Sequence, residues 1–395
     1  MGMGNELMVN SFLSGFSGIR KVFAVGALLG LMACEQMPAV QLPKLDRTKP
    51  IPVALLVPKS DADIADLAQS LENAARLAVQ ESPDVAIDLR VYDTAGNEAI
   101  AAQMAQQAVD DGAQIILGPL RAETSNAAAV AVADDGVNVI SFSNNPTIAG
   151  GNLYVLGKTF DNTAERLLEF AAAQGKSRAV VVYPNNIEGT FGLQAFRKAA
   201  QKSGVAIVSE QGFEFNETAV VNAIPMIRAA VEIEQADLLL LTSTSSGALP
   251  LLAQLLPENG LDPMEIQYAG LARWDVPAQM LDLPGVQNGW FAVPDTAGSE
   301  NFATRYELGN GTRPHNLAGL AYDAVSIITQ IGRGDGGAVL SAQNLTNPNG
   351  FQGVDGIFRL KNDGTNERAL SIAQIIEKQV TILDPAPRAF SIGGF

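Results

Sequence analysis

Residues 114–145, QIILGPLRAETSNAAAVAVADDGVNVISFSNN, decide the fold of this chain. Three apolar residues at 115–117 predict a buried strand that runs into Gly118 and Pro119, and a helix is predicted at 121–134. A second strand, at 137–140, opens into a polar run. Strands that alternate with helices in this way indicate a parallel sheet, whose strands end together at one edge where ligands bind.

Polar side chains follow both predicted strands, and we expect them to face one ligand cleft. The helix after Gly118 would also point unpaired N–H groups toward this cleft. Gly, Pro and Asn equally form ordinary turns, so the pattern is stronger evidence for the architecture than for any single residue. The candidate cleft residues here are Thr124, Ser125, Ser143, Asn144 and Asn145.

Composition excludes several functional classes. The chain has 395 residues, 47% of them hydrophobic, which is enough for two folded lobes. Its net charge of −16 would repel a phosphate backbone, so nucleic acid is not expected as a partner. One cysteine and one histidine cannot assemble a Cys/His zinc site, and no metal or cofactor is predicted.

The N-terminus reads as a lipoprotein signal peptide, residues 1–33. Arg20 and Lys21 precede an apolar run at 22–32, which is shorter than a membrane-spanning helix. The run ends in Leu31-Met32-Ala33-Cys34, which resembles the lipobox of bacterial lipoproteins. Cys34 is therefore the predicted lipidation site; an ordinary signal peptide with an incidental cysteine is the alternative.

A proline-containing tether, residues 34–49, is expected to follow and to hold the folded part at the periplasmic face of the envelope. Glu35 and Gln36 follow the cysteine in place of an aspartate, which favours the outer membrane by resemblance to enterobacterial sorting. The inner membrane stays open as an alternative.

Alternating strands and helices with a restart midway predict an α/β fold of two Rossmann-like lobes, each a parallel sheet flanked by helices. We expect the first lobe to comprise 50–160 with 294–337, and the second 161–293 with 350–384. Residues 385–395 are expected to form a loosely ordered tail.

No catalytic motif stands out in the sequence. Residues 332–337 match G-x-G-x-x-G, but they follow a helix where a dinucleotide fingerprint must follow a strand. His315 lies beside Pro314 with no paired residue type nearby, and Asp61, Asp63 and Asp66 lie at a helix start, where acidic residues favour the dipole. The chain is therefore interpreted as non-enzymatic.

Two tryptophans are the remaining candidates. Trp274, beside Arg273, follows a predicted strand at 266–269, and Trp290 lies beside Phe291. Arg273 and Trp274 are predicted to line the cleft, and both tryptophans are candidate anchors for a protein partner, although core packing is the commoner role.

Several motifs together resemble type 1 periplasmic binding proteins of the leucine-binding kind, over about residues 50–383. They are the strand at 53–57 ending in Pro58, the segments 73–78 and 92–94, and the two strand ends at 116–119 and 141–144. The resemblance implies two lobes that close like a clamshell on a ligand, with crossovers near 158–162, 291–294 and 338–353.

With its lipobox and short tether, the chain looks most like lipoproteins of this family called penicillin-binding protein activators, which stimulate a peptidoglycan synthase. Better-known members carry an additional helical-repeat domain, which is absent from this sequence. A penicillin-binding protein is therefore the expected partner, with a small-molecule ligand in the cleft as a further expectation. The alternative is a lipoprotein that binds an amino-acid-like solute for an ABC importer.

The sequence departs from the amino-acid-binding members at three places. Glu123 stands where they hold the ligand carboxylate with hydroxyl groups, and the run 271–273 replaces the acid that holds the ammonium. Near Gly189, the run 188–190 lacks their aromatic residue. These departures predict that the cleft does not bind a free α-amino acid.

Overall fold

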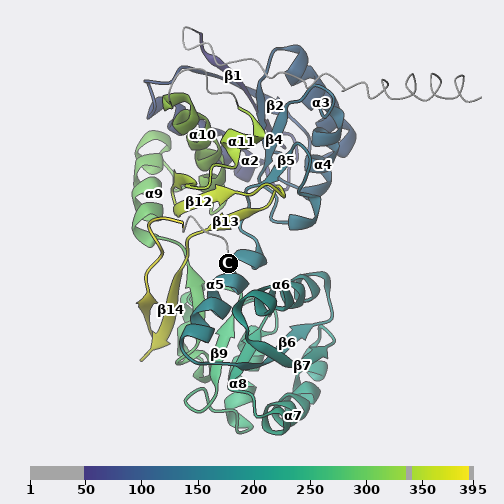
Figure 1. Cartoon of the computed structure of the whole chain (residues 1–395), viewed down its shortest axis with the longest axis vertical. Coiled ribbons are helices and arrows are strands. Elements are labelled where there is room, and N and C mark those ends of the chain that lie inside the picture. The colour runs from purple at the N-terminus through teal and green to yellow at the C-terminus, as the bar shows by residue number, and fades with distance from the viewer. Residues whose placement is uncertain (1–48, 335–339, 391–395) are drawn as a thin grey trace, which may run out of the picture. The chain divides into compact units, whose positions relative to one another are not determined.

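The computed structural model describes residues 49–334 and 340–390, which form two large sheets, one small sheet and their covering helices (Figure 1). The predicted signal peptide, Cys34, the tether up to residue 48 and the last five residues lie outside this range. Among the described helices, none combines the length and apolarity that crossing a membrane requires.

The first sheet has five strands, all parallel, in the order β2-β1-β3-β4-β5. Its central strand is an apolar run whose alternate side chains point to opposite faces. Val53, Leu55 and Val57 enter one hydrophobic core, and Ala54 and Leu56 enter another. The strands are β1 (Ile51–Val57), β2 (Ile87–Asp93), β3 (Ile115–Leu117), β4 (Asn138–Ser141) and β5 (Leu153–Val155).

Helices cover both faces of this sheet. The face with α2 and α10 holds the larger core, and α3 and α4 cover the other face (Figure 1). Asn97 caps the start of α3 by accepting from the N–H groups of Ala99 and Ile100. The helices are α2 (Ala65–Gln80), α3 (Glu98–Asp110), α4 (Ala122–Ala131), α9 (Thr296–Asn310), α10 (Ala318–Arg333) and the short α11 (Ala342–Leu345), with a 3₁₀ turn η1 (Pro146–Ile148).

The second sheet has seven strands in the order β15-β14-β10-β9-β8-β6-β7. The five strands β6 to β10 are parallel to one another. The sheet is mixed because β14 pairs antiparallel with β10, and β15 pairs antiparallel with β14. The strands are β6 (Arg178–Pro184), β7 (Ala206–Phe213), β8 (Leu238–Leu241), β9 (Gln267–Gly270), β10 (Trp290–Val293), β14 (Ser371–Ile376) and β15 (Gln379–Asp384).

This second sheet also has helices on both faces. One face packs on α5 and α6, and the other on α7 and α8. The elements are α5 (Phe160–Ala173), α6 (Ile187–Ser203), α7 (Glu217–Glu234) and α8 (Leu249–Glu258), with 3₁₀ turns η2 (Ala278–Asp282) and η3 (Pro284–Val286). The predicted α/β fold of two lobes is therefore confirmed, with one sheet parallel and one mixed.

One segment departs from the expected lobe boundaries. A three-stranded antiparallel sheet forms from β11 (Phe351–Gly353), β12 (Gly356–Leu360) and β13 (Asn366–Arg368). Phe351, Phe358 and Leu360 belong to the core of the first lobe, although we expected residues 350–384 in the second. Their apolar side chains pack against α10, so the third crossover lies at 369–370, not at 338–353.

Candidate functional site

The first-lobe rim comprises the turns after β3 and β4, residues 118–125 and 141–145. Gly118 has φ +81°, and a Cβ there would lie 2.3 Å from the carbonyl oxygen of Leu56. Only glycine fits this approach, which lets the chain turn from β3 toward α4. The sequence pattern therefore positions α4 where it was predicted to begin.

The hydroxyl groups of this rim are bonded within the lobe. Ser125 is fully buried, with its Oγ 2.7 Å from both the Arg121 carbonyl oxygen and the Ser141 Oγ. Thr124, 3% exposed, donates to the Arg121 carbonyl at 3.0 Å. The Ser143 Oγ accepts from the N–H group of Asn145 at 3.1 Å. These side chains stabilise the two turns.

The remaining residues of the first-lobe rim reach solvent. Asn144 and Glu123 are exposed, and Asn145 accepts from the N–H group of Thr147 at 3.0 Å, which caps η1. The Glu123 carboxylate lies in the first turn of α4 and lines a pocket of the first lobe with Asn97 and Arg121, not the cavity between the lobes. Acidic residues in the first turn of a helix favour its dipole, which gives Glu123 a structural role as well.

The second-lobe rim comprises the ends of β8 and β9, residues 242–245 and 270–276. Here two buried hydroxyl groups, on Thr242 and Ser243, have no hydrogen-bond partner among the described residues. Buried polar groups are normally paired, so each one marks a strained or functional position. The two rims therefore differ: the hydroxyl groups of the first-lobe rim are hydrogen-bonded within the lobe, and those of Thr242 and Ser243 on the second are not, within the part of the chain that the structure describes.

Trp274 does not line a cleft, contrary to our prediction. Its side chain is fully buried and stacks on Phe291, with ring centroids 6.4 Å apart. Gly270 and Gly289 make room for the indole, since a Cβ at either would come within 2.3 Å of its ring. Trp290 is also buried and packs edge-on against Phe170. Because neither indole is exposed, the proposed anchors for a protein partner are corrected to core residues.

Arg273, in contrast, faces a cavity of about 670 Å³ that is lined by both lobes. Its guanidinium group donates to the Asp275 carboxylate at 2.6 Å and 2.5 Å. Arg313 pairs with Glu300 at 2.7 Å on the opposite wall. His315 also lines this cavity, and its Nδ1 accepts from the N–H group of Leu317 at 3.2 Å.

A second ion pair lies deeper in this cavity, at the crossovers. Lys158 bonds Asp355 at 2.5 Å, and Ser299 donates to the same carboxylate at 2.6 Å. Burial alone would raise the pKa of Asp355, but Lys158, Ser299 and Arg368 outweigh it and hold that pKa below its ordinary value. Asp355 is therefore ionised and fixed in place.

Behind Asp355 lies a fully buried pair, Asp323 of α10 and Arg368 of β13, 3.3 Å apart. Burial is the main cause that raises the pKa of Asp323 to about 6, with Arg368 opposing it and Asp355 adding to it. Arg368 also donates to the Leu156 carbonyl at 2.8 Å, and Asn366 donates to the Val155 carbonyl at 2.8 Å. Two crossovers are thus tied together by side chains.

Sequence reasoning missed this crossover network. Asp323 stood out as an acid inside the apolar run 317–331, which is the one signal that could have found it. Lys158, Asp355 and Arg368 carry no such signal, because their burial arises from contacts between distant segments. The described residues hold no cluster of His, Cys, Asp or Glu that could bind a metal ion.

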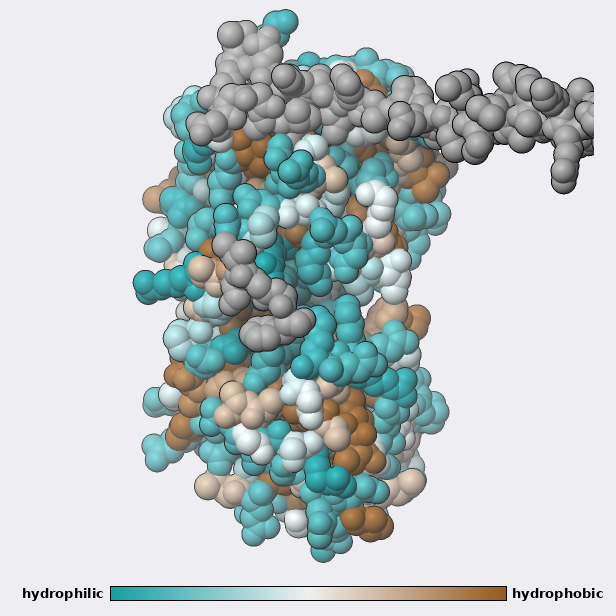
Figure 2. All heavy atoms as spheres, viewed as in Figure 1, coloured by the Kyte–Doolittle hydropathy of each residue, from teal (hydrophilic) through white to brown (hydrophobic). Residues whose placement is uncertain are grey.

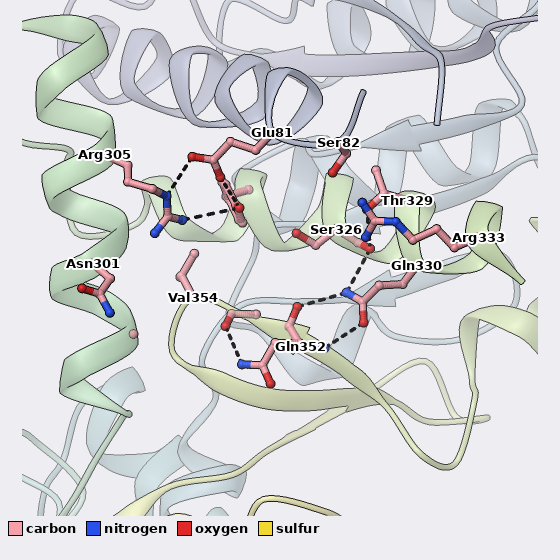
Figure 3. Close-up of a pocket in the computed structure, with 13 residues that line it drawn as sticks. Glu81, Ser82, Asn301, Arg305, Ser326, Thr329, Gln330, Arg333, Gln352 and Val354 are labelled. Atoms are coloured by element: carbon pink, nitrogen blue, oxygen red, sulfur yellow. Dashed lines mark hydrogen bonds and ion pairs between the residues drawn. The ribbon is translucent and has the colours of Figure 1, made fainter. Parts of the chain in front are cut away.

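Another cavity, of about 540 Å³, lies on the first lobe between α2, α9, α10 and β11 (Figure 3). Arg305 donates to Glu81 at 2.7 Å, and Tyr322 donates to the same carboxylate at 2.6 Å. The Gln330 amide bonds both backbone groups of Gln352, at 3.1 Å and 3.0 Å. Because only the first lobe lines this cavity, it is a weaker candidate site than the one that both lobes line.

Comparisons with solved structures show which class of protein has this architecture. A protein of Rhodospirillum rubrum assigned to branched-chain amino acid ABC transport is 20% identical with a TM-score of 0.71, covering 85% of this chain and 100% of that one. An ABC transporter substrate-binding protein of Desulfitobacterium hafniense, in complex with Leu, is 18% identical with a TM-score of 0.60, covering 85% and 100%. A solute-binding protein of Rhodopseudomonas palustris BisB5, in complex with 3,4-dihydroxybenzoic acid, is 16% identical with a TM-score of 0.53, covering 86% and 97%.

These likenesses define the fold as the two-lobe fold of type 1 periplasmic binding proteins. The family described as "Periplasmic binding protein" matches residues 50–379, and the chain belongs to that family. Membership implies a periplasmic or envelope location. A search of curated proteins found no match.

Proposed function

We propose that this chain is a lipid-anchored envelope protein that acts through a protein partner, by activating a peptidoglycan synthase of the penicillin-binding protein class. The observation that carries the proposal is the state of the first-lobe rim. The hydroxyls of Thr124 and Ser125 bond to backbone, and an exposed carboxylate, Glu123, lies beside them in the first turn of α4. A rim of this kind repels the carboxylate of an amino acid, which argues against amino-acid delivery as the main task.

The second-lobe rim supports the same proposal. Arg273 follows β9, where the amino-acid-binding relatives are expected to hold the ligand ammonium with an acid, and its own partner is Asp275. A guanidinium group at this position repels an ammonium. The net charge of −16 would steer the protein toward a basic surface on the synthase, so association should slow as salt rises.

The test adds the purified full chain, carrying Cys34→Ser so that it stays unlipidated, to purified bifunctional synthases from the same cell. Glycan polymerisation and crosslinking are then measured at low and high salt. Stimulation that weakens with salt supports the proposal. If no synthase responds and the purified protein carries a tightly bound small molecule, the proposal is wrong.

A second candidate function is a receptor for a small organic anion, delivered to an ABC importer. It is favoured by the cavity between the lobes, whose wall carries Lys158, Arg273 and Arg313, each of which would exchange its carboxylate partner for that of a ligand. One structurally similar protein was solved with an aromatic carboxylate. Calorimetry against aromatic carboxylates and against leucine, isoleucine, valine and glutamate separates the cases. Micromolar binding of a carboxylate that Arg273→Ala abolishes favours the receptor, and micromolar binding of an amino acid contradicts both proposals.

The anchor is tested separately. We propose that Cys34 carries the lipid and holds the protein at the periplasmic face of the outer membrane. A Cys34→Ser protein should lose fatty-acid labelling and leave the membrane fraction. Labelling that persists in this variant would rule out the anchor and leave the choice of partner unaffected.

A further inference from the structure

The outermost strand of the second sheet, β15, is exposed along nearly its whole length, and no described helix covers it. Its only extensive contacts with a described element are those with β14. Val380 is 39% exposed and Ile382 47%, and both continue the face on which Ile375 enters the core of the second lobe. Figure 2 shows apolar side chains at the surface along the left margin of the lower half, where Figure 1 places β14. Edge strands of this kind pair readily with another chain.

The backbone groups that β15 offers can be deduced from its hairpin. Glu377 and Lys378 form a two-residue turn, with φ values of 49° and 63°. The Ile375 carbonyl accepts from the N–H group of Asn288 at 2.7 Å, so it points away from β15. Val380, opposite Ile375, therefore forms a pair without hydrogen bonds and directs its own N–H and C=O outward. Alternation along the strand places the groups of Ile382 outward as well.

The sequence of β15 is complementary to itself when read in the antiparallel direction. Centred on Thr381, Val380 of one copy lies opposite Ile382 of the other, so that both outward-facing residues exchange hydrogen bonds. Pairs of β-branched side chains and Thr–Thr pairs are favourable across strands. Lys378 lies in the turn before the strand and pairs with Asp282 at 3.0 Å, and Asp384 ends the strand and pairs with Arg166 at 2.6 Å. Neither end therefore places an unpaired charge against a second copy.

We propose that two copies of this chain pair edge to edge through β15, in the antiparallel register centred on Thr381. The contact joins the two second-lobe sheets into one continuous sheet. The antiparallel register that pairs the strand with its own copy sets Val380 against Ile382 on both sides of a central Thr381 pair. A second copy therefore fits this edge better than an unrelated strand.

The register is tested by disulfide trapping in the full chain, with Cys34→Ser so that the introduced cysteine is the only one. In the proposed register the two Thr381 residues face each other in a pair without hydrogen bonds, whose Cα atoms lie about 4.5 Å apart. This distance suits a disulfide. Thr381→Cys should therefore give a covalent dimer on mild oxidation, visible on a non-reducing gel.

Gln379→Cys is the matched control, because residue 379 lies on the same face and is equally exposed. In this register the two copies of residue 379 lie about 13 Å apart, too far for a disulfide. Sedimentation of the Cys34→Ser chain with Ile382→Lys should show at least a tenfold weaker dimer. Equal trapping at both positions, no trapping at either, or a dimer that Ile382→Lys leaves unchanged would overturn the proposal.

Discussion

The first-lobe rim and the second-lobe rim use their polar side chains in opposite ways. On the first-lobe rim, Ser125 and Ser141 bond to each other at 2.7 Å, so the hydroxyls hold the turns together. On the second-lobe rim, Thr242 and Ser243 are buried without a partner among the described residues. Satisfied hydroxyls contribute stability, whereas unsatisfied buried ones cost it. The first-lobe rim is therefore stabilised by its own hydroxyl bonds, and the second-lobe rim carries two buried hydroxyls that lower its stability.

The largest loss of stability is expected from a substitution in the second-lobe core, directly beneath the second-lobe rim. Trp274→Ala removes a fully buried indole that lies between Gly270 and Gly289, and should cost about 3–5 kcal/mol of unfolding free energy. Denaturant unfolding measures this cost. The control is Arg273→Ala, whose half-exposed ion pair should contribute less than about 1 kcal/mol. If Trp274→Ala left the stability unchanged, Trp274 would not be a core residue, and its predicted place in the cleft would stand again.

The next effect concerns the crossovers that join the rims. Asp323 has a pKa of about 6 in the folded protein against 3.8 ordinarily, so the folded state keeps a proton that the unfolded state loses between these values. This proton adds on the order of 3 kcal/mol to the free energy of unfolding. The contribution is fully present below about pH 4 and is lost as the pH rises through 6.

Asp323→Asn should remove this pH dependence while keeping an oxygen that can accept from the N–H group of Val354. Unfolding measured between pH 4 and 7 should therefore show the wild type losing stability relative to the variant. Asp355, whose pKa is lowered, is present in both proteins, but it also raises the pKa of Asp323, so Asp355→Asn measured alongside separates the two contributions. Parallel pH profiles for the two proteins would contradict the assignment.

The third prediction weakens the first-lobe rim. Ser125→Ala removes a hydroxyl that lies within bonding distance of Arg121 and Ser141, and should cost about 1–2 kcal/mol. Ser141 keeps its bond from the N–H group of Ser143, so the turn should survive. If Ser125→Ala instead left stability unchanged, the rim hydroxyls would not be structural and the contrast between the rims would fail.

The sequence predicted the architecture because strand and helix periods are local properties. The apolar run at 115–117 and the turn at Gly118 appear where expected, and so do the second strand and its polar exit. The direction of each side chain was not predictable, because it depends on contacts between distant segments. The Ser125 hydroxyl, for example, points inward to bond Ser141, which lies on strand β4. Trp274 was misplaced for the same reason: the glycines that admit its ring come from two other segments of the chain.

The smallest expected effect tests the second-lobe rim directly. Thr242→Val replaces an unpartnered buried hydroxyl by a methyl group of similar shape, so stability should hold or rise by up to about 1 kcal/mol. Thr329 is the matched control, since it is equally buried but donates to the Ser326 carbonyl at 3.1 Å. Thr329→Val should therefore cost about 1 kcal/mol. Denaturant unfolding of both variants decides the point. If Thr242→Val costs as much as Thr329→Val, its hydroxyl is satisfied in solution, and the second-lobe rim is as self-sufficient as the first.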